Sequence, residues 1–146
     1  MKRYLRTGVL LIAVVVNNGC NRTQQHEALA DEVVQLFQEL CSILEGIQNE
    51  TTAQASVGKL DALNAKFELA YQRYTSLPGI SEEENTRIKQ RFEGGVKSLE
   101  PRLKQAATST MIKAGKSRAT VSTAMDRLFA TLDKFSKFDQ MQQRKR

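Results

Sequence analysis

Residues 26–49, HEALADEVVQLFQELCSILEGIQN, decide the fold class of this chain. Apolar residues recur there at alternating spacings of four and three, at Leu29, Val33, Leu36, Leu40, Ile43 and Ile47. Four more apolar residues widen the stripe: Val34, Phe37, Cys41 and Leu44. This periodicity places the apolar side chains along one side of an α-helix. The stretch therefore predicts a helix with a broad buried face, in which Cys41 serves as a small apolar side chain.

The same alternation returns in three stretches further along the chain. A second helix is expected over residues 52–76, with residues 49–52 supplying capping side chains and Leu77-Pro78-Gly79 ending it. Ser81 and Glu84 have the spacing of a capping box, and the acids at 82–84 suit the positive end of a helix dipole, so a third helix begins there. A last helix is expected over about residues 118–138.

The third helix carries two interruptions. Gly94-Gly95 lies in its middle and Pro101 follows. An interior glycine costs about 1 kcal/mol and an interior proline about 3 kcal/mol relative to alanine. Either Pro101 is the first residue of a separate helix or one kinked helix continues to about Lys113. For the glycine pair, a close helix crossing is favoured over both a hinge and a tolerated irregularity.

Four amphipathic stretches without strand-like alternation predict an all-α fold, an antiparallel up-down-up-down four-helix bundle. Helices that follow one another in sequence are expected to be neighbours in space. The alternative is a three-helix bundle with one long kinked helix, if Pro101 ends nothing. The expected parts of the chain are a signal peptide at 1–19, a tether at 20–25, the bundle at 26–138 and a basic tail at 139–146.

The expected signal peptide reads MKRYLRTGVLLIAVVVNNGC up to Cys20. Three basic residues precede an apolar run at 8–16, which is too short to span a bilayer but suits an export signal. With Gly19-Cys20 after this run, the stretch resembles a bacterial lipoprotein signal. The resemblance implies that Cys20 is acylated, becomes the mature N-terminus and anchors the protein in a membrane of the cell envelope. The alternatives are an ordinary signal peptide and an apolar first helix in a soluble protein.

Several functions lack the residues they need. His26 is the single histidine, so no His pair, no Glu-x-x-His di-iron motif and no Cys-x-x-Cys-His haem motif exists. Residues 114–117, AGKS, resemble the end of a phosphate-binding loop, but they lack its first glycine and follow a predicted helix. An enzyme, a cofactor and a metal site are therefore not expected. Nucleic acid is not an expected partner either, because the excess positive charge lies at the two ends of the chain.

Charge divides the rest of the chain into halves of opposite sign. Residues 20–100 hold eight basic and 13 acidic residues, whereas residues 101–146 hold 11 basic and three acidic ones. One interpretation is that the basic later helices lie against the acidic earlier ones. The other is that a run of cations contacts an envelope protein, an anionic lipid or a wall polymer. This run consists of Arg102, Lys104, Lys113, Lys116 and Arg118.

Two functions remain after these exclusions. In the first, the chain is a membrane-tethered interaction or scaffold module that presents a basic helix face. In the second, the bundle opens along its axis and binds a small apolar ligand. The aromatic residues expected to line such a site are Tyr71, Tyr74, Phe92, Phe129, Phe135 and Phe138, although plain core packing explains them more simply.

Overall fold

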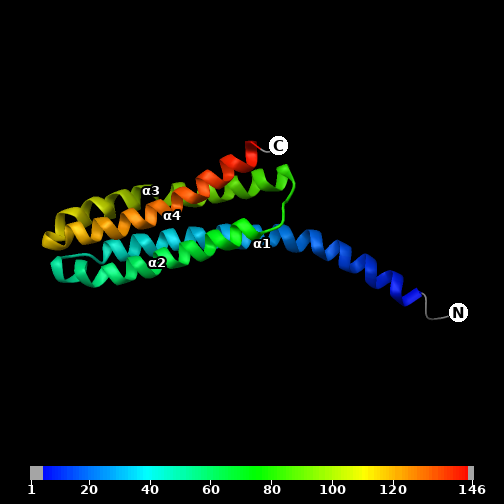
Figure 1. Ribbon diagram of the computed structural model, residues 1–146, viewed down its shortest axis with the longest axis horizontal. Helices are drawn as coiled ribbons and strands as arrows, with labels where there is room; N and C mark the ends of the chain where they lie inside the picture. The colour runs from blue at the N-terminus through cyan, green and yellow to red at the C-terminus, as the bar shows by residue number, and fades with distance from the viewer. Residues whose placement is uncertain (1–4, 145–146) are drawn as a thin grey trace.

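The computed structural model describes the backbone of residues 5–144 and the side chains of residues 21–135 and 137. Its helices are α1 (Leu5–Glu45), α2 (Glu50–Ser76), α3 (Glu82–Lys113) and α4 (Arg118–Arg144), with a single 3-10 turn, η1 (Gly115–Ser117), before α4 (Figure 1). No strand occurs within residues 5–144. The predicted all-α fold with four packed helices is confirmed.

The two predicted helix starts have the geometry expected of them. At the start of α2, Asn49 Oδ1 accepts a hydrogen bond from the Thr52 N–H at 2.9 Å, and Thr52 Oγ1 accepts one from the Asn49 N–H at 3.0 Å. At the start of α3, Ser81 Oγ accepts from the Glu84 N–H at 3.3 Å. Each cap satisfies backbone donors that the first helical turn leaves without partners.

Pro101 neither ends nor begins a helix, because α3 runs from Glu82 to Lys113 with this residue inside it. Pro101 is exposed on the surface of this helix. Of the two alternatives, the structure therefore has the single helix. The three-helix bundle is nevertheless wrong, because α4 packs as a fourth helix.

Successive helices run in opposite directions, as the up-down-up-down prediction requires (Figure 1). The expectation that sequence neighbours are also spatial neighbours is only partly right. The closest pairs are α1 with α3 and α2 with α4, each running parallel, and α1 also packs against α2. The α1–α2 hairpin thus forms one layer and the α3–α4 hairpin the other, with α3 on α1 and α4 on α2 (Figure 1).

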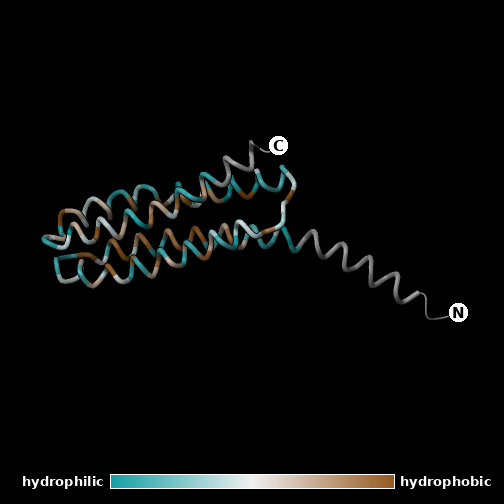
Figure 2. Tube along the Cα trace, viewed as in Figure 1, coloured by the Kyte–Doolittle hydropathy of each residue, from teal (hydrophilic) through white to brown (hydrophobic). Residues whose placement is uncertain are grey.

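The core lies between these two layers (Figure 2), and many of its most buried side chains belong to the half of the bundle nearer the α1–α2 turn. Leu40, Leu44, Ile47, Leu60 and Leu63 are almost fully buried there. The Cys41 side chain is also fully buried, as its place in the apolar stripe predicts. No side-chain nitrogen or oxygen buried among the described residues lacks a hydrogen-bond partner. The interior is thus apolar, and its few polar groups are satisfied.

The segments flanking the bundle differ from their predicted boundaries. Residues 20–25, expected to be a tether, belong to α1, and Thr23 is only 8% exposed against α3. The packed part therefore starts before His26. The apolar periodicity did not predict this start, because Thr23 is a polar residue that is buried through a hydrogen bond. Residues 139–144 of the expected basic tail continue α4, and residues 145–146 lie outside the described part. Within the described residues, no helix has an apolar stretch long enough to cross a membrane.

Candidate functional site: the two ends of the bundle

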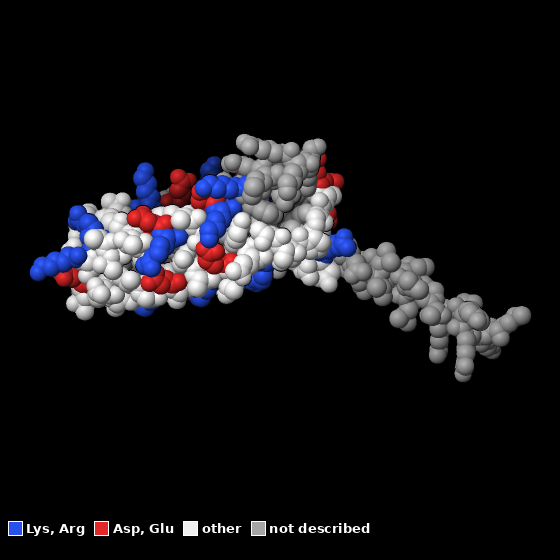
Figure 3. Space-filling view, in the orientation of Figure 1, with Lys and Arg blue, Asp and Glu red and all other residues white. Residues whose placement is uncertain are grey.

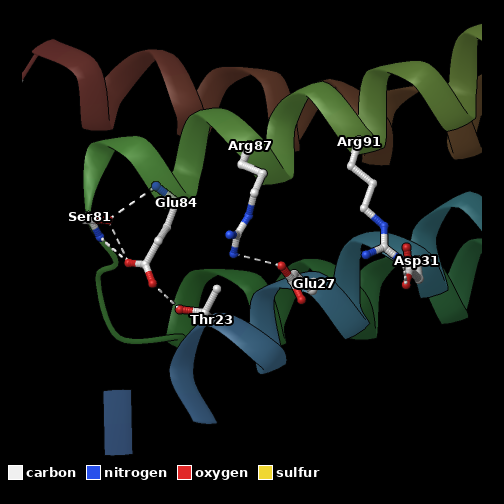
Figure 4. Close-up of polar contacts among 7 residues, drawn as sticks. All are labelled: Thr23, Glu27, Asp31, Ser81, Glu84, Arg87 and Arg91. Carbon is white, nitrogen blue, oxygen red and sulfur yellow. Dashed lines mark hydrogen bonds and ion pairs between the residues drawn. The ribbon is translucent and has the colours of Figure 1, made fainter. Parts of the chain in front are cut away.

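Ion pairs connect acids on α1 with arginines on α3. Glu27 pairs with Arg87 at 3.1 Å and Asp31 with Arg91 at 2.7 Å (Figure 4). Further along the same two helices, Glu45 pairs with Arg102 at 2.6 Å. In each pair the first helix supplies the acid and the third supplies the base.

The other parallel pair of helices follows the same rule. Asp61 and Glu68 on α2 pair with Arg127 and Lys134 on α4. We call these five pairs the interlayer ladder. Three of them, the pairs of Arg102, Arg127 and Lys134, join residues 101–146 to residues 20–100 and confirm that the basic later part lies against the acidic earlier part. The other two pairs lie within residues 20–100. All five are largely exposed, so each adds little to stability. Together they place opposite charges opposite one another along α1–α3 and α2–α4, which favours these pairings of helices.

Arg102 belongs to the ladder and not to a free basic face. Its Nε and Nη2 donate to both carboxylate oxygens of Glu45 at 2.6 Å each, and Nη2 also lies 3.4 Å from Ser42 Oγ. The hydrogen bond from Arg102 lowers the pKa of Glu45 below its usual value, and the same contact raises the pKa of Arg102. The positive charge of Arg102 is therefore compensated by Glu45 within the fold.

The other four predicted contact residues have no acidic partner among the described residues. Lys113 Nζ donates to the neutral amide oxygen of Gln48 at 2.7 Å. Lys116 lies in η1 and Arg118 begins α4, both with exposed side chains. Lys104 is also exposed, but it lies nine residues before Lys113 on α3, about 14 Å along the helix. The structure thus brings three of the five predicted residues together and separates the other two from them.

These three cations lie at one end of the bundle, which we call the turn end. It consists of the α1–α2 connection at 46–49 and the α3–α4 connection at 114–117 (Figure 1). Gly115 has a φ of +55° there, and a β-carbon at this position would lie 3.1 Å from Glu50 Oε2. The left-handed backbone and the close carboxylate both favour glycine. As expected, the AGKS segment is a turn that follows a helix, without the strand that presents a phosphate-binding loop.

A shallow hollow of about 620 Å³ opens at the turn end between the start of α2 and η1. Its lining consists of Glu50, Thr51, Gln54, Ala55 and Ser117. Ser117 Oγ donates to Gln54 Oε1 at 3.2 Å in this lining. Hydroxyl, amide and carboxylate groups therefore face one open space beside Lys116 and Arg118. This hollow could not be predicted from the sequence, because short polar residues at the start of a helix show the same pattern when they act only as caps.

Comparisons with known proteins leave the function to be inferred from the chain itself. No family model, curated protein or solved structure matches it. No group of three or more His, Cys, Asp or Glu side chains that could hold a metal ion occurs in the described part of the chain.

The opposite end of the bundle, which we call the anchor end, contains the α2–α3 connection at 77–81 and the residues that follow Cys20. Thr23 Oγ1 donates to Glu84 Oε1 (Figure 4), and one His26 ring nitrogen, Nε2, lies 2.9 Å from the Pro78 carbonyl oxygen. These contacts fasten α1 to the first turn of α3 and to the α2–α3 connection. The first of them lies three residues after Cys20.

The aromatic residues proposed to line a ligand site do not converge on one space. The Phe135 ring packs against Tyr71 and Tyr74, with ring centroids 5.2 and 5.9 Å apart. Phe92 is half-buried against the core, and Phe129 is 43% exposed. The Phe138 side chain lies outside the described residues. Tyr71, Tyr74 and Phe135 therefore pack on one another and Phe92 packs on the core, whereas Phe129 is exposed.

Proposed function

We propose that the protein is a lipoprotein of the bacterial cell envelope, in which a helical bundle tethered through Cys20 serves as an interaction or scaffold module. Residues 1–19 act as the export signal and are removed. The observation that carries the proposal is the order of the N-terminal features, in which a basic start, a nine-residue apolar run and Gly19-Cys20 follow one another. The protein has no catalytic role and requires no cofactor.

The start of the packed bundle supports this proposal. Thr23 already contacts Glu84, and it lies only three residues after the acylated Cys20. Even a fully extended linker of three residues spans only about 10 Å. The anchor end therefore lies against the membrane that holds the lipid. The turn end lies about 36 Å from the anchor end along the bundle, because Ile47 follows Thr23 by 24 residues.

The turn end supports an interaction role. It carries Lys113, Lys116 and Arg118 without acidic partners, and it faces away from the anchor. A charged end of a tethered module attracts partners of the opposite charge. No contact among the described aromatic residues favours the alternative, binding of a small apolar ligand.

The test is the intact mass of the full-length gene product recovered from membranes of a bacterial host, alongside Cys20→Ala. We expect a chain that begins at Cys20 and carries added acyl mass, and we expect this species to be absent from the variant. A soluble chain that still begins at Met1 would contradict the proposal. A cleaved but unacylated chain would also contradict it and would favour an ordinary exported protein.

A further inference from the structure

We propose that the turn end binds an anionic polymer of the envelope whose repeating units carry both phosphate and hydroxyl groups. This inference rests on the proposed function, which places the turn end in the cell envelope. The binding surface consists of three cations, Lys113, Lys116 and Arg118, together with the hollow between α2 and η1. Two independent properties of this surface, its charge and its hydrogen-bonding groups, identify the partner.

The charge argument begins with the interlayer ladder. Along the bundle, acids of α1 and α2 compensate Arg87, Arg91, Arg102, Arg127 and Lys134. The ladder stops at Glu45 on one side and at Asp61 on the other, and the cations beyond them have no acidic partner in the described part. Lys and Arg side chains protrude at this end, on the left of the view in Figure 3. Uncompensated cations on an exposed end attract polyanions.

The hollow beside these cations specifies more than charge. Thr51 offers a hydroxyl group and Gln54 an amide NH₂ group, whereas the Ser117 hydroxyl donates to Gln54 Oε1. Glu50 accepts hydrogen bonds from hydroxyl groups but repels a phosphate placed next to it. The hollow is therefore suited to the neutral hydroxyl-bearing part of a chain. The adjacent cations are suited to its phosphates, so the surface as a whole matches a polyol or sugar phosphate polymer.

The distance between the two ends argues against the anchoring membrane as the partner. The turn end lies about 36 Å from Thr23 along the bundle. At physiological ionic strength, charges are screened over about 8 Å. Lipid headgroups next to Cys20 are therefore too far away to attract Lys116 and Arg118. A polymer that extends outward from the membrane can reach them.

The test uses the full chain purified from host membranes in a neutral detergent, with immobilised poly(glycerol phosphate) as the probe. The triple variant K113Q/K116Q/R118Q removes the cations. The matched control, K89Q/K97Q/K137Q, removes three exposed lysines that lie at least about 24 Å from the turn end along their helices. We expect the first variant to bind at least tenfold more weakly and with a shallower salt dependence. The control should stay within twofold of the wild-type chain.

A second pair of probes tests the hollow. The variant T51A/Q54A should weaken binding to poly(glycerol phosphate) severalfold and leave binding to inorganic polyphosphate unchanged, because polyphosphate chains carry no hydroxyl-bearing carbon units. Equal losses for both probes would overturn the assignment of the hollow. A thermal melt of each variant checks that the fold is retained.

Three results would overturn the proposal as a whole: no polymer binding by the wild-type chain at low salt, equal losses for the two triple variants, or stronger binding to vesicles containing anionic lipid than to the polymer. None of these results depends on the mass of the N-terminus. The lipoprotein proposal is therefore tested separately, by the acylation of Cys20.

Discussion

Gly95 on α3 faces Val34 on α1 so closely that a β-carbon at position 95 would lie 2.9 Å from Val34 Cγ2 and 3.2 Å from Val34 Cγ1. Valine is stiff about χ1, so its methyl groups cannot turn away cheaply. The glycine therefore permits the close parallel approach of α1 and α3. This finding confirms the interpretation of Gly95 as a packing position, whereas Gly94 has nothing within 4 Å of a built β-carbon.

Gly95→Ala should lower the free energy of unfolding. Overpacking costs about 1–3 kcal/mol, of which the higher helix propensity of alanine returns up to about 1 kcal/mol. Urea denaturation monitored by circular dichroism measures the difference. Gly94→Ala is the matched control and should stabilise the protein by up to about 1 kcal/mol. Equal effects at the two positions would show that Val34 does not limit the approach.

The second prediction concerns acid stability at the anchor end. Hydrogen bonds from Thr23 Oγ1 and from Ser81 lower the pKa of Glu84 from 4.5 to about 2. Because the pKa is lower in the folded state, this contact stabilises the fold fully above about pH 4.5, and the contribution is lost as the pH falls to about 2. Thr23→Val should raise the pKa of Glu84 and flatten this part of the pH profile of stability.

The carboxyl chemical shift of Glu84, followed through a pH titration, measures this pKa directly. Thr86→Val is the control, because the Thr86 hydroxyl bonds only to the backbone carbonyl of Glu82. An unchanged Glu84 titration in Thr23→Val would refute the contact between α1 and the start of α3. It would also remove the argument that the packed bundle begins three residues after Cys20.

The third prediction concerns Thr110, which is fully buried at the turn end of α3. Its Oγ1 donates to the Leu44 carbonyl oxygen at 3.1 Å. Thr110→Val keeps the shape of the side chain but loses this bond, which should cost about 1 kcal/mol. The cost is limited because the Leu44 carbonyl also accepts from the Ile47 N–H. Thr108→Val, whose hydroxyl bonds within its own helix, should change the urea midpoint little.

The fourth prediction concerns the thiol of Cys41. Burial raises its pKa, and this effect outweighs the opposing charge of Arg102. A buried thiol with little thiolate reacts only when the surrounding helices open. In the full-length Cys20→Ala chain, labelling by a disulfide reagent at pH 8 should be roughly a hundredfold or more slower in buffer than in denaturant. Equal rates in the two conditions would mean that α1 does not bury this position.

Local features of this fold could be predicted from the sequence because their causes are local. The alternating spacing from Leu29 to Ile47 indicates a buried helix face, and the capping pairs at Asn49 and Ser81 mark where α2 and α3 begin. Helix periodicity and caps depend on residues within a few positions of one another. The same reasoning located the cations at 113, 116 and 118 but could not tell that Arg102 is compensated. Its partner, Glu45, lies 57 residues earlier in the chain.

The sequence by itself determined four helices, their directions, the opposite charges of the two halves and an N-terminus that resembles an anchoring signal. Only the tertiary structure decided that α3 packs beside α1 and α4 beside α2, that Pro101 lies within one helix and that the packing starts at Thr23. Connections of a few residues between antiparallel helices permit more than one arrangement around the core. Which arrangement forms depends on long-range fits, such as Gly95 against Val34, and on the interlayer ladder. No local pattern in the sequence reveals such fits.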